Sequence, residues 1–210
     1  MLRAGSGDRQ RPCGAESGPY TLATLKIDAL RIVNYPSPVL LQRAAEVGAV
    51  TDQIRAVAAR MVELMREADG IGLAAPQVGL SVRLFVVDVP PTDDGERSLG
   101  SDPATATRGP MVFINPTLHA PEGAPEPMEE GCLSLPDIRG DVLRPPVVTV
   151  RALNERGEPF EMRCGGLLSR CVQHEFDHLE GVLIIFRMTQ MSRLKSRSAV
   201  RDLEKAAGAR

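Results

Sequence analysis

Two histidines, four residues apart, constrain this chain more than any other feature of its sequence. They lie in the segment Gln173-His174-Glu175-Phe176-Asp177-His178. If the segment is helical, His174 and His178 project from the same face. Two imidazoles so placed can bind one transition-metal ion, and Glu175 beside them can reach a water molecule on that ion. A solvated helix face is the plainer interpretation, but the chain has only 3 histidines, and the pairing therefore favours a metal site.

A catalytic metal ion needs a third protein ligand besides the histidine pair. His119, the remaining histidine, follows a predicted strand and has the pattern of an ordinary solvated residue. Glu204 is a second possibility, because a thermolysin-like site takes a glutamate from a following helix. The segment around Glu204 is strongly basic, however, and is expected to form a solvated helix.

Two cysteines are also candidates for the third ligand. Cys171 shares the face of His174, but seven residues separate it from His178, which is about 10 Å along a helix axis. A short thiol cannot span that distance to share one ion. Cys132 remains, between Gly131 and Leu133, although a lone cysteine is more often a buried, inert residue.

Composition narrows the classes of protein to which the chain can belong. Its 210 residues, with 43% hydrophobic and 25% charged, are typical of one ordinary globular domain. No apolar run approaches the ~20 residues that a membrane helix needs, and the first residues lack the apolar core of a secretory signal. We therefore expect no membrane contact and a cytoplasmic location with reduced cysteines, while organelle targeting stays open.

The chain divides into three regions by composition and charge. Residues 1–27 are rich in Gly, Arg, Pro and Ser and predict a poorly ordered extension. Residues 28–190 are expected to form the catalytic domain, and residues 191–210 a basic C-terminal helix. From residue 187 onward the chain has seven basic and two acidic residues, whereas the whole chain has a net charge of −2.

The order of predicted helices and strands indicates an α+β domain. A helix after Thr51 has an apolar face, a capping threonine and a closing Gly70. That face consists of Ile54, Val57, Ala58, Met61, Leu64 and Met65. Further helices are expected at 39–41, 167–179 and 189–207, strands at 82–89, 111–118, 147–153, 159–163 and 182–186, and a long surface loop at 90–110.

Three segments together resemble the signature motifs of the peptide deformylase family. They are Gly70-Ile71-Gly72-Leu73-Ala74-Ala75-Pro76-Gln77, Glu130-Gly131-Cys132-Leu133-Ser134 and the histidine segment 173–178. The resemblance implies a compact single α+β domain, with antiparallel or mixed sheets around a central helix that carries the two histidines. It also implies Cys132 as the third ligand of one divalent metal ion. Fe2+ is the expected ion, with Zn2+, Ni2+ or Co2+ able to substitute.

The same resemblance implies the reaction. A peptide deformylase hydrolyses the N-formyl group from the formylmethionine of nascent polypeptides and releases formate, so its substrates are N-formylmethionyl peptides. Glu175 fits the general base that takes a proton from water and delivers it to the departing amine. The Gln77 side chain and the backbone N–H of Leu133 are the candidate donors to the oxyanion. A plain polar turn residue is the alternative for Gln77.

The substrate pocket can be predicted in part from helical spacing. Leu167 and Cys171 share a face with the histidines and would line a pocket suited to an unbranched methionine side chain, unless they are simply core residues. The resemblance adds Ile71, Gly72 and Met128 to that pocket.

Three charged residues have weaker assignments. Arg139 matches a family position near the bound peptide. Glu130 and Asp177 either orient the histidine ligands or form structural ion pairs.

Two other classes of protein compete with the deformylase hypothesis. A zincin-like metallopeptidase would share the histidine pair and take Glu204 as its ligand. A ribosome-associated protein with a structural metal would need four ligands, and the sequence offers three. The basic tail is an ordinary solvated face or a site of transient docking to the ribosome, and the oligomeric state, monomer or dimer, stays open. The chain departs from the family in its long extension, its 90–110 loop and Phe186, where an acidic residue is expected.

Overall fold

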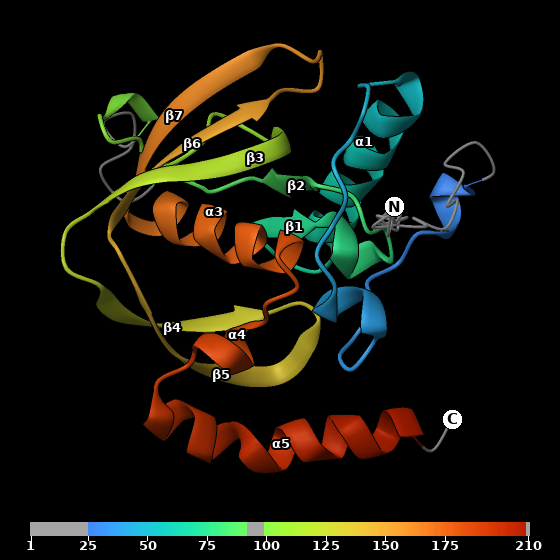
Figure 1. Ribbon diagram of the computed structural model, residues 1–210, viewed down its shortest axis with the longest axis vertical. Helices are drawn as coiled ribbons and strands as arrows, with labels where there is room; N and C mark the ends of the chain where they lie inside the picture. Colours follow the sequence, from blue (N-terminus) through green and yellow to red (C-terminus); the bar gives the residue numbers. More distant parts are fainter. Residues whose placement is uncertain (1–24, 92–98, 209–210) are drawn as a thin grey trace, which may run out of the picture.

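The computed structural model describes residues 25–91 and 99–208, and these form an α+β domain built around one helix (Figure 1). Helix α3 (Gly166–Leu179) lies between a five-stranded sheet and a separate two-stranded hairpin. Every strand pair within these two sheets is antiparallel. The predicted fold class, an α+β domain around a central helix, is therefore confirmed.

The five-stranded sheet has the order β1-β2-β3-β6-β7. Its strands are β1 (Gly72–Ala74), β2 (Leu84–Val87), β3 (Met111–Glu122), β6 (Val147–Leu153) and β7 (Pro159–Gly165). Strands β1 and β2 are buried along their whole length because α1 covers one face and α3 the other (Figure 1). The predicted strands at 82–89, 111–118, 147–153 and 159–163 are thus present, with β3 extending further than expected.

The hairpin of β4 (Glu126–Cys132) and β5 (Leu135–Arg144) has no counterpart in the predicted elements. Its register shifts between Gly131 and Cys132, so the cysteine sits at an irregular end of the strand. β5 alternates buried and exposed residues along much of its length, as expected for a strand with one covered face. Helix α5 covers this hairpin from the outer side (Figure 1).

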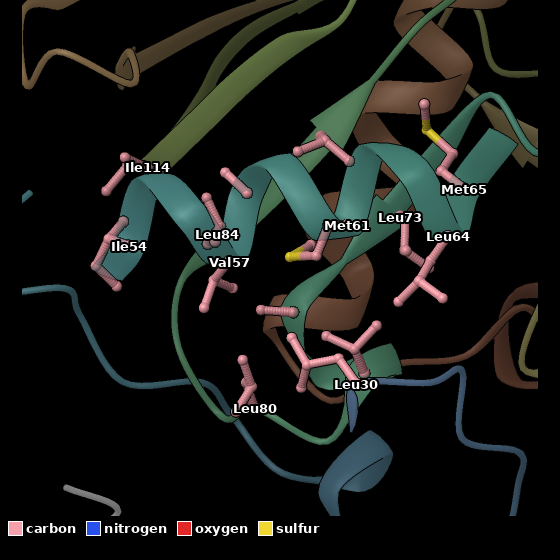
Figure 2. Close-up of a cluster of buried hydrophobic side chains, with 14 of the residues drawn as sticks. Leu30, Ile54, Val57, Met61, Leu64, Met65, Leu73, Leu80, Leu84 and Ile114 are labelled. Carbon is pink, nitrogen blue, oxygen red and sulfur yellow. The ribbon is translucent and has the colours of Figure 1, made fainter. Parts of the chain in front are cut away.

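Helix α1 (Asp52–Glu67) confirms the predicted apolar face. Thr51 caps its start by accepting a hydrogen bond from the Ile54 N–H at 3.3 Å. Figure 2 shows the buried side chains of α1 packed with Leu73 and Leu84 of the neighbouring strands. Burying such side chains contributes about 1.5–3 kcal/mol each, which fixes α1 against the sheet.

The end of α1 corrects one detail of the sequence analysis. Asp69, not Gly70, adopts the left-handed conformation, with φ 52°. The N–H of Asp69 donates to the Arg66 carbonyl and that of Gly70 to the Met65 carbonyl at 2.8 Å, which is the hydrogen-bond pattern of a Schellman cap. Gly70 still closes the helix, but its small size matters because a Cβ there would lie 2.8 Å from Leu133 Cδ1.

The region after α3 corrects a second expectation. The apolar stretch 182–186, predicted as a strand, instead enters the short helix α4 (Ile184–Arg187), with Leu183 as its N-cap. Helix α5 (Gln190–Gly208) follows, close to the predicted 189–207. Phe186 is 53% exposed on α4. The predicted helix at 39–41 is a 3-10 turn, η3 (Pro38–Leu41), and two further 3-10 turns are η2 (Ile27–Ala29) and η4 (Ala75–Val78).

The 90–110 segment is only partly a surface loop. Ala106 and Thr107 are buried, and the Thr107 hydroxyl accepts a hydrogen bond from the Val89 N–H at 3.0 Å. Residues 92–98 of this segment, and residues 1–24 of the predicted extension, lie outside the described residues. Among the helices of residues 25–91 and 99–208, none has the length and apolar character of a membrane span.

Candidate metal centre

Three potential metal ligands converge between α3 and the end of β4. Cys132, His174 and His178 each offer one ligand atom, and these atoms lie within 4.8 Å of one another. The Cys132 Sγ is 3.3 Å from the His178 Nε2, and the two imidazole rings are 5.1 Å apart between centroids. One sulfur and two imidazole nitrogens suit borderline and softer ions such as Fe2+ and Zn2+. The side chains therefore fit a metal ion held between the helix and the hairpin.

The outer nitrogens of the two histidines have different surroundings. His174 Nδ1 lies 3.0 Å from the Glu130 Oε2. A carboxylate only accepts hydrogen bonds, so Nδ1 carries the proton and Nε2 keeps its lone pair for an ion. His178 Nδ1 is buried and has no hydrogen-bond partner among the described residues. Burial is the largest cause that lowers the pKa of His178, and this favours the neutral imidazole that a metal requires.

Glu130 is the most heavily hydrogen-bonded carboxylate near the centre. Although burial alone would raise its pKa, hydrogen bonds from His174 and Arg144 lower the pKa to about 2. Arg144 donates from Nε to Oε1 at 2.7 Å and from Nη2 to Oε2 at 3.0 Å. Arg170 donates to Oε1 at 2.9 Å. Glu130 is thus a fixed anion that orients His174.

Asp177 makes its ion pairs with arginines. Arg144 donates to its Oδ2 at 2.8 Å, and Arg187 donates to its Oδ1 at 2.7 Å. These bonds match structural ion pairing, the second alternative weighed for Asp177. Glu130 matches both of its alternatives: it bonds His174, as a residue that orients a histidine would, and it also forms ion pairs with Arg144 and Arg170.

Glu175 is buried beside the histidines and points back toward β1. Its Oε2 has no hydrogen-bond partner among the described residues. Burial raises the pKa of Glu175 to about 7, against the lowering effect of His174 and Arg144. A carboxylate with a raised pKa and a free oxygen can both accept and return a proton near neutral pH.

Gln77 lies in η4 and is turned so that its amide nitrogen faces the centre. Its Oε1 accepts a hydrogen bond from the Ala74 N–H at 2.7 Å, and its Nε2 lies 3.6 Å from the Cys132 Sγ. The amide N–H groups therefore point toward the site and can donate to a group bound there. Leu133 follows Cys132 and lines the same pocket.

A pocket of about 440 Å³ opens at this centre. All the residues predicted for substrate contact line it, namely Ile71, Gly72, Met128, Arg139, Leu167 and Cys171. The Cys171 Sγ lies 3.4 Å from the Ile71 carbonyl, and burial raises the pKa of the thiol well above its ordinary value. Cys171 therefore lines the pocket as a neutral thiol.

The competing ligand candidates lie elsewhere. Glu204 accepts a hydrogen bond from the Tyr35 hydroxyl at 2.8 Å, and His119 pairs with Thr117 at an exposed position. Neither belongs to the ligand group that Cys132 completes, so the zincin-like alternative has no support.

Two arginines of the site, Arg144 and Arg170, were not predicted from the sequence. Both are buried, and Arg170 also lines the pocket. One signal in the sequence was the charge of Arg170 next to apolar residues in the predicted helix 167–179. An arginine is unusual on a helix face that is expected to be buried.

Three protein ligands with space for a further one are typical of catalytic metal sites. The fold and the donor set together fit the class of α+β metalloenzymes.

The chain belongs to the polypeptide deformylase family, whose model matches residues 29–194. The peptide deformylase of Acidobacterium capsulatum is 46% identical over 175 residues, which are 83% of this chain and 95% of the relative. That of Rhizorhabdus wittichii is 44% identical over 179 residues, covering 85% and 96%.

Solved structures agree with the sequence relatives. The Plasmodium falciparum peptide deformylase superposes with a TM-score of 0.73 at 35% identity, covering 85% of this chain and 98% of that chain. The Ehrlichia chaffeensis enzyme gives 0.75 at 30% identity, covering 86% and 97%. The fold and the motifs thus agree with one family.

Gly72 provides a test of how closely β1 approaches α3. A Cβ at Gly72 would clash with the Glu175 carboxylate and lie 2.7 Å from the Cys171 Sγ. We expect Gly72→Ala to lower the free energy of unfolding by about 1–3 kcal/mol through overpacking, measured by urea denaturation. Gly48→Ala is the control, since nothing lies within 4 Å of a Cβ there, and its effect should stay within about 0.5 kcal/mol. Equal stabilities for the two variants would contradict the close packing of β1 on α3.

Proposed function

We propose that this chain is a metal-dependent peptide deformylase that removes the N-formyl group from formylmethionine at the start of nascent polypeptides and releases formate. The observation that carries the proposal is the group of Cys132, His174 and His178 beside the buried Glu175, in a member of the polypeptide deformylase family. N-formylmethionyl peptides are then the substrates, and the cytoplasm, where nascent chains emerge, is the expected location.

The metal would be held by the Cys132 thiolate and the Nε2 atoms of His174 and His178. We infer Fe2+ as the physiological ion, with Zn2+, Ni2+ or Co2+ able to replace it. When bound, the ion lowers the pKa of a coordinated water molecule and so supplies the nucleophile. Because the Cys132 thiolate would reduce the formal charge of the centre, a nearby base on the protein would matter more than at a site with three neutral ligands.

Glu175 is that base in the proposal. Its partner-free Oε2 and its raised pKa support proton transfer from the water to the departing amine. The amide of Gln77, already turned toward Cys132, and the backbone N–H of Leu133 would donate hydrogen bonds to the oxyanion of the tetrahedral intermediate. Removing one such donor typically costs about 3 kcal/mol of transition-state stabilisation.

The pocket beyond the ligands would take the methionine side chain. Its wall includes Ile71, Met128, Leu167 and the neutral Cys171, and flexible or apolar groups of this kind suit an unbranched thioether. Arg139 is exposed at the same pocket, where its charge could contact the backbone or carboxylate of the peptide. Gly72 keeps space for Glu175 at the inner end.

Two substitutions separate the proposed base from the proposed ligand. Glu175→Gln should lower formate release from formyl-Met-Ala-Ser by about 10²–10⁴-fold while the protein keeps one equivalent of metal, since no ligand is lost. Cys132→Ala should lose both metal and activity. Formate release and metal content measured on the same anaerobic preparations check both outcomes.

The control for these variants is Cys164→Ala, at a buried cysteine on β7 outside the ligand group. It should keep its metal and most of its activity. Full metal retention by Cys132→Ala would instead point to another third ligand and overturn the proposed site.

We also infer that α5 docks transiently to the ribosome, because the substrate emerges there. Lys195, Arg197 and Arg201 are exposed on this helix, and exposed cations bind RNA phosphates in a salt-dependent way. Helix α5 packs on the hairpin, so reversing these charges is a better test than deleting the helix.

The triple change Lys195→Glu, Arg197→Glu and Arg201→Glu should abolish co-sedimentation with ribosomes at low salt and leave the cleavage of a short formyl peptide unchanged. The control is Lys26→Glu, Arg31→Glu and Arg108→Glu, which changes the net charge equally at exposed positions on other segments. If both triple variants co-sediment equally, α5 has no role in docking.

A further inference from the structure

The proposed metal ligands belong to two separate parts of the fold. His174 and His178 are on α3, whereas Cys132 is at the end of β4. The β4–β5 hairpin forms a sheet of its own and is not hydrogen-bonded into the five-stranded sheet. The position of the sulfur relative to the imidazoles therefore depends on how the hairpin docks on the helix (Figure 1).

Arg170 is the side chain of α3 that reaches both strands of this hairpin. Its Nη1 donates to the Glu130 Oε1 and to the Val142 carbonyl, each at 2.9 Å. Its Nη2 donates to the Glu126 carbonyl at 2.9 Å. Glu126 and Glu130 are on β4 and Val142 is on β5, so one guanidinium holds both strands to the helix.

Arg144 makes the reverse connection. It lies on β5 and donates to Asp177 on α3 at 2.8 Å, as well as to Glu130 on its own hairpin. The helix α3 and the β4–β5 hairpin thus each contribute one buried arginine that bonds the other part, and both guanidinium groups bond the Glu130 carboxylate. Arg170 is the arginine that belongs to α3, the helix that carries the two histidines.

The geometry of Arg170 requires a guanidinium. Its three acceptors are one carboxylate and two backbone carbonyls, and the residue is 8% exposed. A planar fork donates in several fixed directions at once, whereas a lysine ammonium on a flexible stem is a compact point charge. Without Arg170 the buried Val142 carbonyl would also lose this donor, and a buried acceptor that loses its donor is costly.

We infer that Arg170 is a positioning residue for the metal centre. By holding β4 and β5 against α3, it sets the distance between the Cys132 sulfur and the two imidazoles, and by bonding Glu130 it steadies the acceptor that orients His174. The inference rests on the proposed function, in which these three side chains bind the metal. It assigns to a pocket-lining arginine a role in metal affinity that differs from contact with the substrate.

The test compares Arg170→Met and Arg170→Lys with Arg83→Met. Arg83 is the matched control: it is also buried, it also pairs with an acidic residue, Glu180, and it stacks on Phe176 of α3. Its bonds go to Glu180 and to the Pro116 carbonyl, not to the hairpin. Apo proteins are titrated with Co2+ against a chelator, and the thiolate-to-cobalt absorption band and the melting temperature are recorded for each.

Arg170→Met should weaken Co2+ binding by about ten- to a hundredfold, as is typical when a residue supporting a metal ligand is lost, and should weaken the thiolate band. Arg170→Lys should fall between this variant and the wild type, because the charge remains and the fork is lost. Arg83→Met should lower the melting temperature but keep Co2+ affinity within about twofold. If Arg170→Met does not fold, Arg170→Lys decides, with Arg83→Lys as its control.

Equal Co2+ affinity in the Arg170 and Arg83 variants, with an unchanged thiolate band, would overturn the positioning role. That result leaves the proposed function standing, provided that the wild type binds Co2+ through a thiolate and releases formate. A wild type that shows no thiolate band would instead contradict the proposed metal site itself.

Discussion

The buried Glu130 carboxylate holds together the two parts of the fold from which the candidate site is built. It accepts hydrogen bonds from Arg144, Arg170 and His174. Because Glu130 is on β4, Arg144 on β5 and the other two on α3, these three elements meet at one carboxylate. Removing one partner of a buried ion pair typically costs about 3–5 kcal/mol, because the remaining charge is left uncompensated. A carboxylate with two arginine partners stays ionised, and only an ionised carboxylate fixes the histidine tautomer that leaves Nε2 free.

The rest of the domain positions Glu175 and Gln77 around this contact between the hairpin and α3. All five strands of the larger sheet contact α3. Gly72 lets β1 come close enough for Glu175 to be enclosed between β1 and α3. The η4 turn then places Gln77 opposite, with its oxygen held by a backbone N–H and its nitrogen directed at Cys132. The candidate base, the candidate donors and the ligands thus come from α3, from η4, and from the end of β4 with the turn that follows it. These three segments are distant in sequence.

Local patterns in the sequence were enough to predict some of this arrangement. The 3.6-residue period identified α1 and its buried face, and the spacing of His174 and His178 identified their common face. Cys132 was a different case, because spacing only left it as the remaining candidate and the family resemblance implied its role. The β4–β5 hairpin was missed because its strands contain Pro127, Pro136 and several charged residues, which weaken any strand signal.

Long-range pairing explains the other omissions. Nothing near Arg144 or Arg170 in the sequence shows that both reach Glu130, since these partners are 14 and 40 residues away. Within the stretch 182–186, Leu183, Ile184 and Ile185 are buried in the same cluster as Val142 of the hairpin. A short buried helix cannot be told from a strand by composition alone. At the end of α1, Asp69 adopts the left-handed conformation, and Gly70 follows at a point where a Cβ would lie 2.8 Å from Leu133 Cδ1.

The central claim is that one sulfur and two imidazoles bind a single ion between the hairpin and the helix. X-ray absorption spectroscopy on the Zn2+-loaded protein tests this most directly, because it counts the sulfur and nitrogen neighbours of the ion. The account predicts one sulfur at about 2.3 Å and two imidazole nitrogens at about 2.0–2.1 Å, with a further light atom completing the shell. A first shell without sulfur, or one with four protein ligands, would contradict it.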